Sequence, residues 1–445
     1  MIRSSKLQSR FSDFKIYLKP VCLRMFFLGF SAGLPLLLVL GTLGFWLREA
    51  GIDLKTIGFL SWVGLVYGCK WLWAPLVDNV KLPWLSEHLG QRRAWVCPSP
   101  GLALSQVMLI ISLSGMAFSN PQTHMPQIVA FALLTAFCSA TQDISLDAYR
   151  IESASADLQG ALAATYQTGY RLAMIWAGAG AFALAAFFQS TPSGIYDQTG
   201  WTWAYLIMAA SISVGLATTL LSPAPNASDE ESKLRQLEEM RHHVHAFILR
   251  HPSLPRSIAK VVGWFGFVCV RPIADFFYRY RWHALAILLL IATYRISDVV
   301  MGVMSNPFYR DMGFTKEEVA AVSKIFGGVM TLVGTFIGGI VVLRIGILKT
   351  LLVGALLSAG TNLLFSALAA IGHSLPFLVF TVSADNLSGG LASAAFIAYL
   401  SGLTNVQYSA TQYAVFSSIM LILPKFLAGF SGYWSRVSGT QTFLS

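Results

Sequence analysis

The sequence predicts an all-α, polytopic membrane protein with two helical bundles, and three observations support this fold class. Of its 445 residues, 55% are hydrophobic and only 12% are charged, whereas soluble domains carry roughly 25% charged residues. Eleven apolar runs reach the length of about 20 residues that a helix needs to cross a bilayer. None alternates like a barrel strand. A polar segment at 222–281 divides the runs into six and five.

The predicted spans follow one another in two groups. Six lie in an N-terminal bundle at 22–221 and occupy 22–47, 56–77, 95–118, 125–149, 160–188 and 201–221. Five lie in a C-terminal bundle at 282–445 and occupy 283–309, 318–343, 349–371, 376–403 and 408–434. A twelfth span would begin where the sequence ends, so we expect either a truncated sequence or a bundle without its last support helix.

Charge inside the spans separates them into two kinds. The third, sixth and ninth runs have no charged residue in their interiors. Seven others share nine charges: Lys70, Asp143, Asp147, Arg171, Arg295, Asp298, Lys324, Asp385 and Lys425. A charge at the bilayer centre costs about 3 kcal/mol even on a mild scale, so such residues normally face protein or water. We therefore expect the charged spans to line a polar cavity and the uncharged spans to contact lipid.

Basic residues outside the spans indicate the topology. They gather in an N-terminal tail at 1–21, between the second and third runs, and in the central segment at 222–281. Cytoplasmic loops retain Lys and Arg, so the tail and the central segment are predicted to be cytoplasmic. The net charge of +10 is therefore a topology signal, and no nucleic-acid partner is expected.

The central segment is predicted to contain two amphipathic helices, near 230–250 and 257–278. Arg271, Pro272 and Asp275 lie in the second piece, which we therefore place at the membrane interface. His242, His243 and His245 are close together but have no cysteine nearby, so a solvated helix face is favoured over a metal site. The five cysteines are scattered, which predicts no disulfide.

The two halves contain a local repeat. Phe45-Trp-Leu-Arg48 followed by Gly51 resembles Phe308-Tyr-Arg-Asp311 followed by Gly313, and both stretches lie between the first two spans of a half. Repeated halves in the same orientation are typical of a major-facilitator-type, two-bundle transporter. Together with the charge layout and the central loop, this repeat predicts that architecture, with eleven transmembrane helices.

Two groups of intramembrane charges are candidates for function in the N-terminal half. At 100° per residue, Asp143, Asp147 and Arg150 fall on one helix face. For Asp147 and Arg150, the alternative to a functional role is an ion pair at the membrane interface. Arg171 lies about 16 Å along its span. Neither Arg171 nor Lys70 has an acidic residue one turn away on its own helix. Their partner must therefore come from another helix or from a substrate.

The C-terminal half repeats this pattern. Arg295 and Asp298 are close enough to pair at i,i+3, Lys324 lies inside the eighth span, and Asp385 lies near the centre of the tenth. The deepest charges include more cations than carboxylates, which predicts an anionic substrate, because an unpaired buried cation must be offset. Burial makes protonation of a carboxylate accessible, so Asp143, Asp147, Asp298 and Asp385 are candidates for proton coupling.

Motifs of enzymes are absent from the sequence, including the Walker phosphate loop, the nucleophile elbow and HExxH. We therefore predict a transporter driven by a gradient or by exchange, with no enzymatic activity, no metal and no cofactor.

Several stretches resemble the AmpG-like muropeptide permeases of the major facilitator superfamily. They are Leu28-Gly-Phe-Ser-Ala-Gly-Leu-Pro35, Ile52-Asp-Leu-Lys-Thr-Ile-Gly58, Lys70-Trp-Leu-Trp-Ala-Pro-Leu-Val-Asp78, Gln142-Asp-Ile-Ser-Leu-Asp-Ala148, Asp385-Asn-Leu-Ser-Gly-Gly390 and Tyr408-Ser-Ala-Thr-Gln-Tyr413. The resemblance covers residues 22 to about 443. It departs from the family in the missing final helix and in Asp385, where the family has glutamate.

The resemblance implies proton-driven import of anhydromuropeptides across the bacterial inner membrane by a multi-pass protein, for which we expect a monomer. These anionic glycopeptides match the excess of cations. The expected substrate-binding residues are Lys70, Gln142, Arg171, Arg295, Lys324 and Asn386. Asp78, with Arg92 and Arg93, resembles the superfamily's cytoplasmic gating motif, and Arg150 is assigned to the gate with them.

Two other functions remain open from the sequence. An acetyl-coenzyme A carrier from a related branch would also bind an anion, and uptake assays would separate the two. A membrane sensor or scaffold would bind a ligand without moving it. Transport is favoured because nine intramembrane charges are costly in a scaffold.

Overall fold

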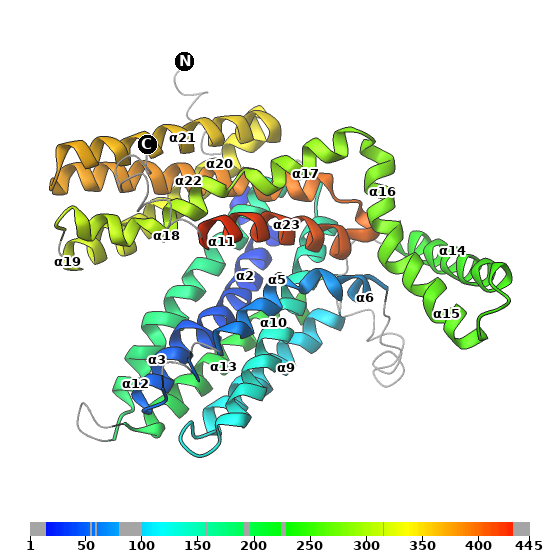
Figure 1. Ribbon diagram of the computed structural model, residues 1–445, viewed down its shortest axis with the longest axis horizontal. Coiled ribbons are helices and arrows are strands. Elements are labelled where there is room, and N and C mark those ends of the chain that lie inside the picture. The colour runs from blue at the N-terminus through cyan, green and yellow to red at the C-terminus, as the bar shows by residue number, and fades with distance from the viewer. Residues whose placement is uncertain are drawn as a thin grey trace.

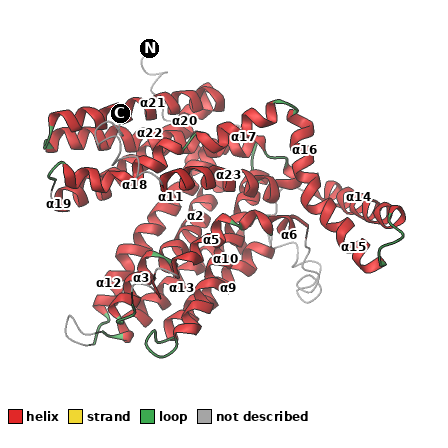
Figure 2. Ribbon diagram, in the orientation of Figure 1, coloured by secondary structure: helices red, strands yellow, loops and turns green. Residues whose placement is uncertain are grey.

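The computed structural model describes residues 15–53, 56–57, 60–79, 100–155, 158–190, 196–223, 228–314 and 316–429. Every regular element in these ranges is helical (Figure 2), as the sequence predicts. A polypeptide in hydrocarbon must satisfy its backbone hydrogen bonds internally, and a helix does so within a single segment.

The N-terminal half is built from long helices. After the short 3-10 turn η1 (Lys15–Leu18), α2 (Pro20–Val39) continues into α3 (Gly41–Glu49) to form the first span. The third, fourth and sixth spans are α9 (Pro100–Phe118), α10 (Met125–Glu152) and α13 (Gln198–Leu221). The fifth consists of α11 (Gln159–Ile175), the π-helical turn η5 (Trp176–Gly180) and α12 (Ala181–Phe187).

The second predicted span, 56–77, is not one continuous helix. It consists of η2 (Ser61–Gly64), α5 (Leu65–Gly68), η3 (Lys70–Leu72) and α6 (Ala74–Asn79). Gly64 and Gly68 have low helix propensity, and Pro75 lacks a backbone N–H donor. Apolar length alone predicted an uninterrupted helix, and these helix-breaking residues explain why the prediction was wrong.

The central segment forms two antiparallel pieces that lead into the C-terminal half. α14 (Ser228–Arg250) packs on α15 (Arg256–Phe265), which continues through the π turn η6 (Gly266–Val270) into α16 (Arg271–Tyr280). The C-terminal half then consists of α17 (His283–Thr293), α18 (Ile296–Asp311), α19 (Lys316–Val319), the π turn η7 (Ala320–Phe326), α20 (Gly327–Ile345), α21 (Ile347–Ile371), α22 (Leu375–Leu403), η8 (Val406–Tyr408) and α23 (Ser409–Gly429).

The predicted count of eleven spans is not confirmed. Among the described residues, eight helices are long and apolar enough to cross a membrane, or nine if α22 and α23, bent by 99°, count as one span. The run at 56–77 is broken, and the run at 283–309 is interrupted at Tyr294 and Arg295. The count also includes Arg256–Tyr280, which the sequence places at the membrane interface.

Close glycine contacts join the helices within each half. A Cβ atom on Gly29 would lie 2.3 Å from the carbonyl oxygen of Tyr166, and one on Gly169 would lie 2.0 Å from that of Phe26. In the other half, a Cβ on Gly334 would lie 2.0 Å from the carbonyl oxygen of Leu387. Only glycine permits these approaches of α2 to α11 and of α20 to α22, because tight packing between membrane helices depends on small residues.

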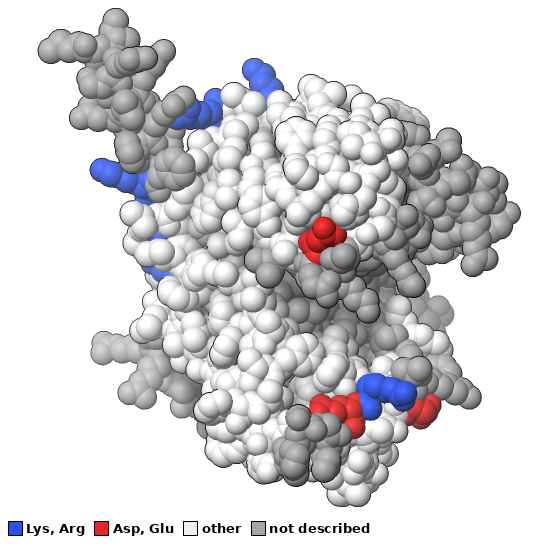
Figure 3. Space-filling model, turned by 90° about the vertical axis from the view of Figure 1, so that its left-hand side faces the viewer, with Lys and Arg blue, Asp and Glu red and all other residues white. Residues whose placement is uncertain are grey.

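The two halves meet at one end and diverge toward the other (Figure 1). At the joined end, the Tyr17 hydroxyl donates to the Phe336 carbonyl at 2.7 Å, and the Ser409 hydroxyl donates to Glu152 at 2.5 Å. The surface between the halves is recessed on the face where they part (Figure 3). The molecule is therefore a two-lobed structure that is closed on the side where α10 ends.

Candidate functional site

A buried charge cluster lies where α10 approaches the broken second span. Asp147 forms ion pairs with Arg150 at 3.2 Å and with Lys70 at 3.8 Å. Lys70 comes from η3, so its partner is supplied by another helix, which is one of the two alternatives that the sequence left open. Asp147 therefore meets two cations in this conformation, and all three side chains are buried.

Arg150 connects the two halves. Its guanidinium donates to the Ser401 hydroxyl of α22 at 3.3 Å and lies 4.9 Å from the ring centroid of Tyr413 on α23. The ring of Tyr166 on α11 is 5.7 Å away. Arg150 has no exposed surface, yet its Nε and Nη1 atoms have no hydrogen-bond partner. The predicted gating residue therefore lies at the interface between the halves, on the closed side.

Asp143 lies one helical turn before Asp147. Its Oδ1 atom is buried without a hydrogen-bond partner, and the charges of Lys70 and Asp147 both act on it. A buried carboxylate without full compensation is costly. Among the predicted proton-coupling residues of α10, Asp143 is thus the one with less compensation for its charge.

Arg171 and Arg295 come from different halves, and their charges act on each other. Arg171 is on α11, Arg295 precedes α18, and the charge of Arg295 acts on Arg171. Arg295 forms the predicted pair with Asp298 at 3.6 Å, whereas the Nε atom of Arg171 is buried without a hydrogen-bond partner. Both residues are partly exposed, so they place positive charge between the halves.

The two predicted proton-coupling carboxylates of the C-terminal half have hydroxyl partners. Asp298 accepts a hydrogen bond from Ser358 at 2.8 Å, and Asp385 accepts one from Thr361 at 3.2 Å. The charge of Asp298 acts on Asp385. A small cavity of about 160 Å³ is lined by Asp298, Ser358, Tyr294 and Asn362 among others. These groups form a polar patch between α18, α21 and α22.

The other predicted substrate contacts lie within helix interfaces. Gln142 is fully buried and donates to Ser31 of α2 at 3.2 Å. Asn386 accepts from Thr331 of α20 at 2.8 Å and donates to the Val382 carbonyl at 2.9 Å. Their amides are thus engaged with neighbouring helices in this conformation, which sequence spacing alone does not show.

Several predicted residues lie outside the part of the chain whose side chains the structure describes. Arg92 and Arg93 lie outside the described residues altogether. The backbone of Asp78 is in α6, that of Lys324 in the π turn η7 and that of Lys425 in α23, but their side chains are not described. The gating role of Asp78, Arg92 and Arg93 and the binding role of Lys324 stay predictions.

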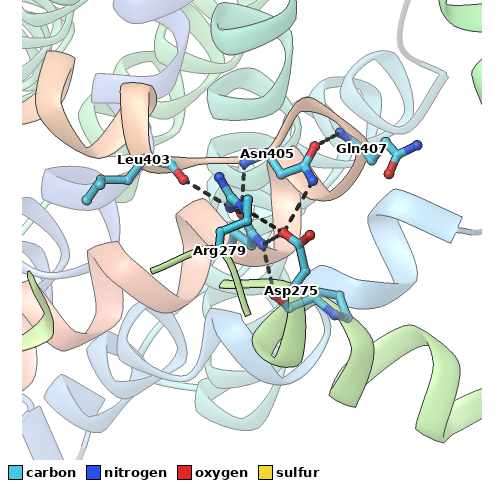
Figure 4. A network of polar contacts seen from close by, with 7 residues as sticks. Asp275, Arg279, Leu403, Asn405 and Gln407 are labelled. Carbon is cyan, nitrogen blue, oxygen red and sulfur yellow. Dashed lines mark hydrogen bonds and ion pairs between the residues drawn. The ribbon is translucent and has the colours of Figure 1, made fainter. Parts of the chain in front are cut away.

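One polar network was missed by the sequence reasoning. Asp275 and Arg279 of α16 pair at 2.9 Å, and Arg279 donates to the Leu403 carbonyl at 3.2 Å and to Gln412 at 2.9 Å (Figure 4). Asn405 donates to Asp275 at 3.2 Å. The i,i+4 spacing of Asp275 and Arg279 predicts their pair, but no local signal indicates the turn between α22 and α23.

This architecture is that of a transporter of the major facilitator type. The family model of the Major Facilitator Superfamily matches residues 25–429. Two solved structures share the fold: the transporter FucP, at 14% identity and a TM-score of 0.61 over 96% of this chain and 95% of that chain, and the proton:xylose symporter XylE, at 13% identity and 0.57 over 97% and 92%. The chain is thus a multi-pass membrane transporter and not an enzyme.

Curated relatives define the branch more closely. The anhydromuropeptide permease of Escherichia coli K12 is 33% identical over 430 residues, which cover 96% of this chain and 77% of that protein. A Rickettsia felis protein named AmpG 4 is 29% identical over 433 residues, which cover 97% of this chain and 93% of that protein. The chain belongs to the AmpG-like muropeptide permease family, as its motifs indicate.

Proposed function

We propose that this protein imports anhydromuropeptides across the bacterial inner membrane by proton symport. The observation that carries the proposal is the unpartnered, buried Nε atom of Arg171 in a site where the charge of Arg295 from the other half also acts, so that the positive charge is only partly compensated. A carboxylate-bearing ligand would supply the missing negative charge. The named activity of the Escherichia coli relative supports the same substrate class.

An arginine pair suits a substrate that carries several carboxylates. A guanidinium presents a planar fork of donors that matches a carboxylate. With one arginine from each half, a single substrate would contact both lobes and draw them together. That coupling of binding to closure is what alternating access requires.

Proton coupling is assigned first to Asp143 and second to Asp298. Asp143 has a buried, unpartnered oxygen next to a cluster that contains two cations and a second carboxylate. Protonation would remove the cost of its uncompensated charge. Asp147 and Asp385 remain further candidates.

The predicted topology supports import as the proposed direction. If the basic N-terminal tail and central segment are cytoplasmic, the closed side faces the cytoplasm, and the recess between the halves opens outward. A cleft that opens outward is accessible to cell-wall fragments outside the membrane. Arg150 would then belong to the inner gate.

Proteoliposome uptake tests the proposal. The purified full chain should accumulate a radiolabelled anhydromuropeptide when an inwardly directed proton gradient is imposed, and unlabelled ligand should compete. Accumulation of radiolabelled acetyl-coenzyme A with no accumulation of muropeptide would favour the carrier alternative. Ligand binding without counterflow would favour a sensor.

Asp143→Asn tests the coupling residue. It should abolish gradient-driven accumulation while exchange of internal for external ligand persists, because exchange needs no net proton movement. Asp197→Asn is the matched control, since Asp197 caps α13 by accepting from the Thr199 N–H at 2.8 Å and asparagine caps equally well. If uptake by Asp143→Asn still follows the pH gradient, the coupling site lies elsewhere.

A further inference from the structure

The central segment exposes an apolar stripe along one helix. The stripe residues are each between 40% and 64% exposed, and they are Ile258, Val261, Val262 and Phe265 of α15 and Ile273 and Phe277 of α16. Their i, i+3, i+4, i+7 spacing in α15 places them on one face. A neighbouring face of α15 packs on α14, because Ala259 and Gly263 are buried, and a Cβ on Gly263 would lie 3.1 Å from Phe247 of α14.

Basic residues accompany this stripe. Arg250, Arg256 and Lys260 are exposed near the turn that joins α14 to α15, and Figure 1 shows this helix pair projecting from the body of the molecule. By the helical period, Arg256 and Lys260 lie on the side of α15 away from the stripe. Apolar side chains on one helix face with exposed Lys and Arg on the polar face are typical of helices that bind an anionic membrane surface.

The polar network on α16 holds the stripe in a defined orientation. Asp275 and Arg279 bind Asn405, Gln412 and the Leu403 carbonyl (Figure 4), while Pro272 and Phe276 of the same face are buried. The helix is thus fixed to the turn between α22 and α23, with Ile273 and Phe277 directed outward.

The positions of the helix ends argue against a single membrane crossing by residues 256–280, although their length and composition would allow one. The end of α10 contacts Ser401 near the end of α22 through Arg150, and the end of α16 contacts Leu403. The C-terminal ends of α10 and α16 therefore lie on the same side of the membrane. With the fifth and sixth spans both crossing the membrane, α13 ends two crossings after α10 and returns to that side, so the central segment begins and ends there.

We propose that α15–α16 docks, through its apolar stripe and its basic residues, on the anionic phospholipid headgroups of the leaflet next to the closed side of the transporter. Continuity with the membrane domain supports this occupant, because the helix leads directly into α17. The docked helix would be linked to the turn between α22 and α23 by the α16 network.

Site-directed spin labelling of the full chain tests the docking without requiring transport activity. Single labels replace Val261, Val262 or Phe265 in a background whose native cysteines are changed to serine. The protein is placed in nanodiscs of phosphatidylcholine with or without phosphatidylglycerol. The depth of each label is obtained from the ratio of its accessibility to oxygen and its accessibility to a water-soluble nickel chelate. This ratio should indicate immersion of about 5–10 Å in the anionic discs. A label at the exposed His242 of α14 should remain in water.

Charge neutralisation separates the electrostatic part. Arg256→Gln and Lys260→Gln should each reduce the ratio of immersed to exposed label in anionic discs by about fivefold, with little change in neutral discs. Equal immersion in both discs would overturn the role of anionic lipid. Three results would overturn the docking itself. The labels could lie in water, their depths could increase steadily to the bilayer centre as in a membrane-spanning helix, or protein could shield them from both reagents.

Discussion

Replacement of Arg150 should open the closed side of the transporter. Arg150 contributes a charged hydrogen bond to Ser401 at 3.3 Å and a cation–π contact with Tyr413 at 4.9 Å. The first is worth about 1.5–3 kcal/mol and the second about 2 kcal/mol when desolvated. Their loss would shift the balance between closed and open arrangements by roughly 300- to 4,000-fold, at tenfold per 1.4 kcal/mol.

Pulsed electron–electron distance measurements can check this shift. Spin labels at Ser155, which follows α10, and at Gln407, in the turn between α22 and α23, are both exposed and lie on opposite halves. In Arg150→Ala the distance distribution should lengthen and broaden relative to the parent protein. Because both labels lie outside the charge cluster, they report separation of the halves and not local repacking.

Arg150→Lys is the companion variant. It keeps a cation beside Asp147, so the carboxylate is not stranded, but it lacks the planar fork of the guanidinium. We expect an intermediate distribution and near-normal folding. Distance distributions in both variants that match the parent protein would refute a bridging role for Arg150 and limit it to an ion pair within α10.

The remaining predictions concern packing and the anion site. Gly169→Val should lower the melting temperature in detergent sharply, because its Cβ would lie 2.0 Å from the Phe26 carbonyl oxygen. Gly360→Ala, with nothing within 4 Å of the added Cβ, should be neutral or stabilising by up to about 1 kcal/mol. An equal fall in melting temperature in both glycine variants would contradict the packing argument. Arg171→Ala should weaken ligand binding by about 10- to 100-fold through loss of a charged hydrogen bond, and Arg171→Lys should restore it only in part. An unstable Arg171→Ala protein with unchanged ligand affinity would defeat this assignment.

The sequence alone determined the class of protein and the local charge pairs. Long apolar runs must become helices in a bilayer, so the all-helical fold followed from composition and length. The pairs Asp147–Arg150 and Arg295–Asp298 also followed, because the helix period brings residues at i and i+3 together. The family motifs identified the branch. None of this reasoning needed the packing of one helix against another.

Only the tertiary structure decided which distant residues meet. Lys70 pairs with Asp147 on α10, and Arg150 contacts Ser401 and Tyr413 in the other half. Arg279 donates to the Leu403 carbonyl at the turn between α22 and α23. These contacts depend on helix approaches permitted by glycines such as Gly169, and on the break in the second span. A single sequence specifies periodicity along each helix, but it does not show which helix faces pack together, because that choice is made by contacts between segments far apart in the chain.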